Sequence, residues 1–368
     1  MSFYPILKQY ESFDMDRFLE GVNDKDVRHV LQKTRLTDLD FLILLSGKAE
    51  DYLEEMANKA HQLTVQNFGR VIQFYTPMYL SNFCNNQCAY CGFNTTNTIE
   101  RKQLTLDEVK REAEAISQTG LKHILVLTGD APQLATVDYI SECCNILRDY
   151  FSSIAIEIYA LTREEYEILE HAGVDALTIY QETYSEELYQ TLHPKGPKKD
   201  YRFRLDAPER GLQANFRSVG IGALLGLNRW QQDIFLTALH ADYLQTAYTE
   251  AEISISLPRM RPHEGCFQPA HTISDKSIVQ MMTALRLFLP RAGITVSTRE
   301  SATFRNNILR LGVTRMSAGS CTSVGGHSQI SNQTGQFEIS DNRTVEEMTV
   351  SLKRLGYQPV FKDWQCIL

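Results

Sequence analysis

The stretch VIQFYTPMYLSNFCNNQCAYCGFNTTN, residues 71–97, runs from β-branched and aromatic residues into a segment that carries three cysteines. The first part is typical of a strand. Cys84, Cys88 and Cys91 follow at a spacing that would also suit one face of a helix. The asparagine, threonine and glycine residues around them form loops readily and helices poorly. We therefore predict a loop directly after a strand, not three buried cysteines on a helix.

Three cysteines this close together indicate a metal site. In a reducing compartment, clustered thiols point to metal or redox chemistry more often than to disulfides. Structural zinc usually has four ligands, commonly in CxxC pairs, but here there is no partner pair and no histidine within 20 residues of the cysteines. An iron–sulfur cluster fits better. Thiolates are its usual ligands, and three of them leave one iron open to a small chelating molecule.

The composition excludes several functional classes. Hydrophobic residues make up 43% and charged residues 22% of the chain, a balance typical of globular proteins. The net charge of −8 argues against a nucleic-acid surface or an anionic membrane surface as the main partner. The first residues do not resemble a secretory signal, and no run of about 18 apolar residues is present. We expect a cytoplasmic protein.

Short β-branched or aromatic runs recur after residue 70 and alternate with helical patterns. The predicted strands are 71–79, 123–128, 154–160, 176–181, 218–225, 252–257, 293–298 and 313–317. The predicted helices are 105–119, 136–150, 162–172, 230–243 and 274–290. The first of these helices opens with Thr105 and Glu108 in a capping-box pattern. Eight strands separated by helices favour an α/β fold, a parallel (β/α)8 barrel of the TIM type.

The two ends of the chain depart from this alternation. Residues 1–70 read as amphipathic helices, so we expect a helical N-terminal extension that packs on the barrel. The barrel itself is expected over residues 71–320. Residues 321–368 are expected to form a C-terminal extension packed on the barrel, with a helix near 344–355.

Barrel enzymes place their chemistry at the C-terminal ends of the strands. Polar or flexible residues stand at each predicted strand end, namely Asn82, Gly129, Asp130, Glu157, Gln181, Glu182, Gly222, Arg259, Arg299, Glu300 and Ser317 to Ser320. Glu157 stands inside an apolar run, where a carboxylate is costly unless it is paired or faces a site. The set as a whole predicts a functional site at this end of the barrel.

The CxxxCxxC motif, with Tyr90 before its third cysteine, resembles the signature of the radical S-adenosylmethionine (SAM) superfamily. The resemblance implies that Cys84, Cys88 and Cys91 hold a 4Fe–4S cluster whose open iron binds the amino and carboxylate groups of SAM. It also implies that the reduced cluster splits SAM into methionine and a 5′-deoxyadenosyl radical, which removes a hydrogen atom from the substrate.

The resemblance also assigns residues to the cofactor. Thr128, Gly129 and Asp130 occupy the position of a GGE-like element that meets the amino group of SAM, with aspartate in place of glutamate. Glu157 would bind the ribose hydroxyls. The other candidates for lining the pocket or contacting the cofactor are Tyr90, Gln181, Glu182 and Gly222.

Further stretches, among them CGFNTTNTIERKQLT, HPKGPKKDYRFRLDAPERG, LPRMRP, STRES and SAGS, narrow the resemblance. Over essentially the whole chain they look like the tyrosine lyases of thiamine biosynthesis. That family cleaves the Cα–Cβ bond of L-tyrosine to p-cresol and 2-iminoacetate, which feeds thiazole formation. The family implies a thiazole synthase and a flavodoxin-type reductant as partners.

Two related families remain as alternatives. The tyrosine lyase of hydrogenase maturation carries a further C-terminal cysteine motif, whereas this sequence has a lone Cys366 there, so the thiamine branch is favoured. The other alternative is a radical SAM enzyme that joins tyrosine fragments to a flavin-like precursor, a deazaflavin synthase. Analysis of the products would separate these reactions.

An amino-acid substrate inside a barrel needs a partner for its carboxylate. A guanidinium suits this role because its planar fork donates two parallel hydrogen bonds. Arg299, which ends the seventh predicted strand, is the first choice, with Ser317 and Ser320 as further donors. Arg259 and Arg261 are alternatives, although they could instead pair with Glu300.

Overall fold

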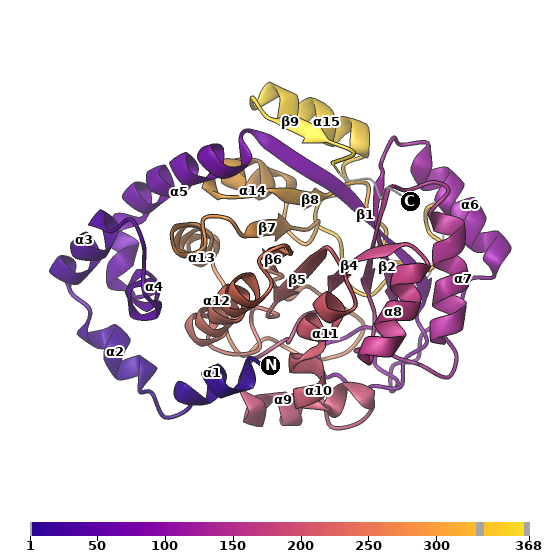
Figure 1. Ribbon diagram of the computed structural model, residues 1–368, viewed down its shortest axis with the longest axis horizontal. Helices are drawn as coiled ribbons and strands as arrows, with labels where there is room; N and C mark the ends of the chain where they lie inside the picture. The colour runs from indigo at the N-terminus through magenta and orange to yellow at the C-terminus, as the bar shows by residue number, and fades with distance from the viewer. Residues whose placement is uncertain (1, 329–334, 364–368) are drawn as a thin grey trace.

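The computed structural model describes residues 2–328 and 335–363. From residue 71 onward, parallel strands alternate with helices and surround a central axis (Figure 1). The strands are β1 (Val71–Ser81), β2 (His123–Thr128), β3 (Ser153–Glu157), β4 (Val174–Thr178), β5 (Ser218–Gly222), β6 (Glu252–Ser256), β7 (Gly293–Val296), β8 (Arg315–Ser317) and β9 (Gln358–Val360). All eight predicted strands are present, within a few residues of the expected bounds.

The first strand closes the sheet into a barrel. Strands β2 to β8 pair in sequence order, and β1 then pairs with both β8 and β2, with Gln73 opposite Arg315 and Thr76 opposite Ile124. The predicted (β/α)8 barrel is therefore confirmed. Strand β9, which the sequence analysis did not predict, lies parallel to the start of β1 with Gln358 opposite Val71.

The predicted helices are also present, within a few residues of their expected bounds. They are α6 (Leu106–Ser117), α7 (Val137–Leu147), α8 (Arg163–His171), α12 (Trp230–Ala247), α13 (Asp275–Phe288) and α15 (Val345–Arg354). The capping box of α6 forms as expected: the Thr105 hydroxyl accepts from the Glu108 backbone N–H, and the Glu108 carboxylate accepts from the Thr105 backbone N–H.

Two connections hold short helices that the sequence analysis missed. Between β4 and β5 the chain forms α9 (Glu186–Leu192), η2 (Pro197–Lys199), α10 (Tyr201–Leu205) and α11 (Ala207–Gln213). Between β7 and β8 it forms α14 (Ala302–Asn307) and η3 (Ile308–Leu311). Elements of three to seven residues give too little periodicity to be recognised from the sequence.

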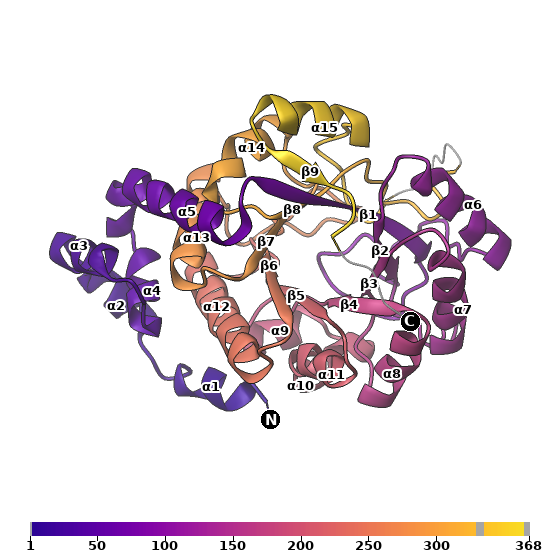
Figure 2. The same cartoon turned by 45° about the horizontal axis from the view of Figure 1, so that its top comes forward.

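The N-terminal helices lie along one side of the barrel (Figures 1 and 2). They are α1 (Tyr4–Gln9), α2 (Met15–Gly21), α3 (Asp24–Gln32), α4 (Asp38–Leu44), η1 (Lys48–Tyr52) and α5 (Leu53–Phe68). Helix α5 packs on α13, and α4 packs on α12 and α13. Phe41 stacks on Phe288 with ring centroids 4.8 Å apart. This is the expected helical extension. The division of the chain at residues 70 and 320 stays a proposal.

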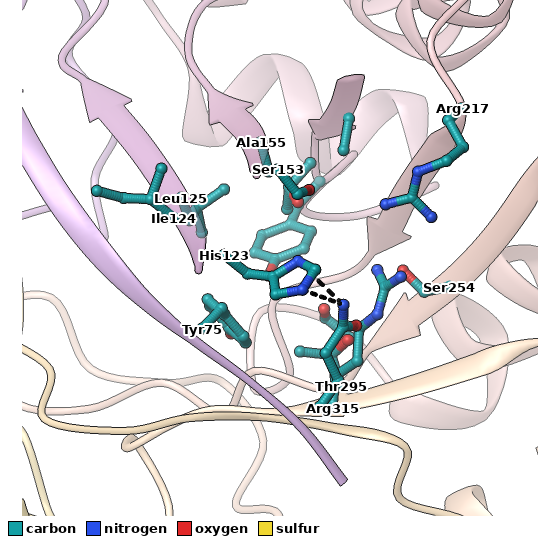
Figure 3. Close-up of a pocket in the computed structure, with 15 residues that line it drawn as sticks. Tyr75, His123, Ile124, Leu125, Ser153, Ala155, Arg217, Ser254, Thr295 and Arg315 are labelled. Carbon is teal, nitrogen blue, oxygen red and sulfur yellow. Dashed lines mark hydrogen bonds between the residues drawn. The ribbon is translucent and has the colours of Figure 1, made fainter. Parts of the chain in front are cut away.

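No helix among the described residues is long and apolar enough to span a membrane. Ala155, Ala176 and Ser254 are among the residues that line a cavity of about 570 Å³, including its opening to solvent, at the N-terminal ends of the strands (Figure 3). We call this the lower cavity. Tyr180 separates it from a second cavity at the C-terminal ends, and lines both.

Candidate active site

The three cysteines lie in an irregular loop over residues 82–97, which follows β1 and contains neither helix nor strand, as predicted. Asparagine side chains hold this loop together. The Asn94 amide donates to the Cys88 carbonyl at 3.1 Å, and the Asn97 amide donates to the Gly92 carbonyl at 3.0 Å. Arg101 adds hydrogen bonds from its guanidinium to several carbonyls of the same loop. The polar composition of the stretch thus satisfies backbone groups that a helix would otherwise pair.

The three thiols of the loop hold their protons more tightly than a free cysteine does. Burial raises the pKa of Cys84 to about 12 and also raises the pKa values of Cys88 and Cys91, so metal binding must displace their protons. Among residues 2–328 and 335–363, no three metal-ligating side chains are arranged to hold one ion. A single ion draws its thiolates to about 2.3 Å. In a four-iron cube each thiolate binds a different iron, so the sulfur atoms lie further apart.

The end of β2 packs closely against the cysteine loop. A Cβ atom added to Gly129 would lie 2.3 Å from the Phe83 carbonyl oxygen, so only glycine fits there. The backbone carbonyl of Asp130 accepts from Asn85 N–H at 2.9 Å, and its carboxylate accepts from the Asn86 amide at 2.6 Å. The Thr128 hydroxyl is buried without a partner in the described structure. These contacts place the whole Thr128–Asp130 element beside the cysteines.

A cavity of about 810 Å³, including its opening to solvent, lies at the C-terminal ends of the strands. We call this the upper cavity. Its lining includes seven of the predicted site residues, Tyr90, Cys91, Thr128, Asp130, Glu157, Glu182 and Arg299, and also Arg261. The C-terminal segment supplies two more residues: Gln336 accepts a 2.8 Å hydrogen bond from the Tyr79 hydroxyl, and Phe337 lies against Arg299.

Glu157 and Arg299 carry opposite charges on the wall of this cavity. Glu157 is the last residue of β3, and burial raises its pKa to about 7 against the opposing influence of Arg299. The Arg299 guanidinium stacks on the Phe337 ring, 3.4 Å from its centroid. Within the described residues, no carboxylate forms an ion pair with Arg299, so its planar fork remains available to a ligand.

The two alternative arginines are already engaged. Arg259 donates to both oxygens of Glu300 and forms an ion pair with Asp275 at 2.8 Å. Arg261 reaches Glu300 at 3.3 Å, and its Nε is buried without a partner in the described chain. The pairing of these arginines with Glu300, which the sequence analysis considered, is therefore present.

A buried group of charges also lines the upper cavity. The Glu182 carboxylate binds Lys198 Nζ at 2.6 Å and Arg204 at 3.6 Å. Glu182 has a φ angle of 69°, which is uncommon outside glycine, asparagine and aspartate. The sequence analysis missed Lys198 and Arg204 as site residues. The only signal for them was the density of basic residues after the fourth strand.

Seven of the predicted residues are not among those that line the upper cavity: Cys84, Cys88, Gly129, Gln181, Gly222, Ser317 and Ser320. Gln181 is buried with its amide 3.5 Å from the Tyr201 carbonyl, and Gly222 packs against the Ser256 backbone. The Ser317 hydroxyl accepts from Thr298 N–H at 3.0 Å, a contact between the ends of β7 and β8. The hydroxyl of Ser320 is buried and has no partner among the described residues.

Comparison with known proteins agrees with this geometry. A family model of the radical SAM superfamily matches residues 78–238, and a model of the biotin and thiamin synthesis associated domain matches residues 256–358. The chain is 38% identical to 2-iminoacetate synthase of Escherichia coli (strain K12), covering 98% of this chain and 96% of that protein. The corresponding synthase of Salmonella typhimurium is also 38% identical, over 97% of this chain and 95% of that protein.

Solved structures show the same fold. Two structures of HydG, a maturase of the FeFe-hydrogenase, match with TM-scores of 0.90 and 0.86 at 31% and 29% identity. They cover 96% and 98% of this chain, which in turn covers 80% and 83% of theirs; the second is from Carboxydothermus hydrogenoformans. From its sequence identity over nearly the whole length, the chain belongs to the 2-iminoacetate synthase family of the radical SAM superfamily.

Proposed function

We propose that this enzyme cleaves the Cα–Cβ bond of L-tyrosine to give 2-iminoacetate and p-cresol, for the thiazole moiety of thiamine. The observation that carries the proposal is the upper cavity. It brings a loop with three cysteines to the same end of the barrel as Arg299, which forms no ion pair with any described residue. Membership of the 2-iminoacetate synthase family supports the same reaction.

The family implies a 4Fe–4S cluster and SAM as cofactors. When bound, they supply a radical that abstracts hydrogen. We assign the cluster to Cys84, Cys88 and Cys91, because all three lie in one loop at the cavity and a cube needs its thiolates on separate irons. The Thr128 hydroxyl, which has no partner among the described residues, and the backbone of Gly129 and Asp130 stand beside that loop, where they can receive the amino group of SAM.

Glu157, Tyr90 and Glu182 are proposed to contact the nucleoside part of SAM. A carboxyl group of raised pKa on a cavity wall can share hydrogen bonds with hydroxyl groups, as the ribose of SAM offers. Tyr90 and Glu182 also line the cavity and are proposed as cofactor contacts. Gln181 and Gly222 do not line the cavity, but Gln181 N–H donates to the Gly222 carbonyl at 3.0 Å. We propose that this pair supports the residues that do line it.

Arg299 is the proposed anchor for the tyrosine carboxylate. Its guanidinium is held flat by Phe337 and has no carboxylate partner among the described residues, so a substrate carboxylate can take both donors of its fork. Anchoring one end fixes the position of the substrate amine, which is a proximity effect. The Ser320 hydroxyl has no partner among the described residues and is proposed as a second donor. Ser317 is proposed to act through its bond to Thr298.

Two protein partners are proposed on the same basis. A flavodoxin-type reductant would supply electrons to the cluster, and a thiazole synthase would receive 2-iminoacetate. The imine product hydrolyses readily in water, so direct transfer to the next enzyme would protect it.

The test is a product assay on anaerobically reconstituted protein with SAM, dithionite and tyrosine. We expect p-cresol and 5′-deoxyadenosine, together with glyoxylate from hydrolysis of the imine. Tryptophan replaces tyrosine in a parallel reaction as the control for substrate choice. If fully loaded protein consumes SAM and forms no p-cresol from tyrosine, the proposed reaction is wrong.

A further inference from the structure

The cysteine loop is supported by a second segment, from another part of the chain. This segment begins at the last residue of α9 and lies along residues 86–90. It comprises residues 192–198, and we call it the brace. Ala89 N–H donates to the Leu192 carbonyl at 3.2 Å, and Gln87 N–H donates to the Lys195 carbonyl at 3.0 Å. The backbone of the cysteine loop is thus paired to the brace on both sides of Cys88.

Two further contacts fix how closely the brace approaches. Lys198 N–H donates to the Asn86 side-chain oxygen at 3.0 Å. Gly196 has a φ angle of 102°, and an added Cβ would lie 2.2 Å from the Asn86 side-chain oxygen and 2.6 Å from its Cα. No other residue could bring the two backbones together here.

His193 links the brace to the aromatic residue of the motif. Its Nδ1 lies 2.8 Å from the Tyr189 carbonyl oxygen, which can only accept, so Nδ1 carries the proton. Its Nε2 lies 2.6 Å from the Tyr90 hydroxyl and therefore accepts from it. The imidazole is fully buried, and burial keeps it neutral by lowering its pKa to about 3.

We propose that His193 is a positioning residue for the cofactor site, because the hydrogen bond that it accepts from Tyr90 fixes the tyrosine ring on the wall of the upper cavity. Tyr90 stands between Cys88 and Cys91, so the same bond restrains the backbone that spaces these two thiols. The inference rests on the proposed assignment of the cluster and SAM to this cavity. It adds His193, which lies outside the CxxxCxxC motif, in the connection between β4 and β5.

The test compares His193→Gln with His193→Phe. The glutamine side-chain oxygen can accept from the Tyr90 hydroxyl much as Nε2 does, whereas phenylalanine matches the ring shape and accepts nothing. Each variant is reconstituted, and its iron content is measured. SAM is then titrated, without tyrosine, while the electron paramagnetic resonance (EPR) spectrum of the reduced cluster is recorded.

We expect His193→Gln to bind SAM within about threefold of the wild type. We expect His193→Phe to bind it at least tenfold more weakly at equal iron content, because a buried hydroxyl loses its partner. A role in packing alone predicts the opposite order, since phenylalanine preserves the ring. That order, or wild-type binding by His193→Phe, would overturn the proposal.

Tyr90→Phe keeps the test decisive if His193→Phe fails to fold, since it removes the same bond with little change of shape. We expect the same loss of SAM affinity as for His193→Phe, and no further loss in the double variant. Losses that multiply would contradict a shared hydrogen bond. His240→Phe is the matched control. His240 is also buried, and its Nδ1 lies 3.0 Å from the Tyr184 hydroxyl. Neither residue lines the upper cavity, so SAM binding should not change.

The two proposals fail separately. SAM binding is read without tyrosine, so it tests the brace even if no p-cresol is formed. A wild-type protein that makes p-cresol, together with a His193→Phe variant that binds SAM normally, would reject the inference and leave the reaction standing.

Discussion

Both ends of the barrel carry charged side chains, but these side chains are paired more completely at the lower end than at the upper end. Arg217 and Arg315 line the lower cavity (Figure 3). Arg217 binds Asp175 at 3.1 Å and Glu252 at 2.9 Å, and Arg315 binds Glu252 at 2.6 Å. His123 is likewise held by Gln73 and Asp363. In the upper cavity, Arg299 has no carboxylate partner among the described residues. The Thr128 hydroxyl, Arg261 Nε and His263 Nε2 are buried there without partners in the described structure.

This difference separates a structural end from a functional end. A buried polar group without a partner costs about 1–3 kcal/mol, so several of them in one place indicate bonds that a ligand or water completes. A saturated group of charges has no capacity left for a ligand and contributes to stability instead. A cavity alone therefore does not identify the site; the unpaired donors inside it do.

The largest expected effect comes from removing one thiol of the upper end. Cys88→Ala leaves two cysteines for the proposed cluster, too few to hold a cube. We expect a folded, colourless protein with p-cresol formation below detection. Circular dichroism and iron analysis check the two parts. A variant that unfolds would indicate a structural metal site in place of a catalytic one.

Arg299→Gln should have the next largest effect. It removes the proposed carboxylate anchor, and loss of a charge-assisted partner costs about 2–5 kcal/mol, so kcat/KM for tyrosine should fall at least about 30-fold. The SAM-dependent change in the cluster EPR spectrum should remain, since Arg299 is assigned to the substrate. If instead the spectral change disappears while tyrosine affinity holds, Arg299 serves the cofactor.

Glu157 predicts a pH effect on the stability of the cofactor-free chain. Its pKa in the folded state is about 7, against 4.5 for an unperturbed glutamate. The folded carboxyl therefore keeps a proton that the unfolded chain loses, and stability falls as pH rises from 4.5 to 7. At about 1.4 kcal/mol per pKa unit, Glu157→Gln should gain about 3 kcal/mol over the wild type at pH 8.

The same comparison at pH 4.5 should show little difference, since both side chains are then neutral. Urea denaturation at the two pH values measures this. A stability difference that is the same at both would show that folding does not change the pKa of Glu157.

The smallest effect on activity is expected at the lower end. Arg217→Gln breaks ion pairs to Asp175 and Glu252 in a half-buried position, so the free energy of unfolding should fall by about 1–2 kcal/mol. The p-cresol rate should stay within about twofold of the wild type. A large loss of rate at unchanged stability would show that the lower cavity takes part in the reaction.

The sequence predicts the barrel well because its strands are strongly patterned. Runs such as 123–128 and 252–256 carry β-branched residues, and the connecting helices show clear periodicity. Strand β9 has three residues with a proline at its centre, so it shows no strand pattern. It forms because the start of β1 leaves an edge for it to pair with.

The site was predictable in part. The cysteine spacing predicts the loop. The positions of Glu157 and Arg299 at the ends of predicted strands indicate that they belong to the site. Lys198, Arg204 and His193 were missed as site residues because they lie in the β4–β5 connection of short helices, whose path depends on tertiary packing. Ser317 is also instructive: its position at a strand end suggested a substrate contact, but only the structure shows its hydroxyl bound to Thr298.

The most direct test measures p-cresol formation by the wild type, Arg299→Gln and Arg217→Gln under identical anaerobic conditions. Each protein is reconstituted to equal iron content and given SAM, dithionite and tyrosine. We predict p-cresol from the wild type and from Arg217→Gln at similar rates, and almost none from Arg299→Gln. Wild-type rates from Arg299→Gln, or loss of activity confined to Arg217→Gln, would contradict the assignment of the upper cavity as the active site.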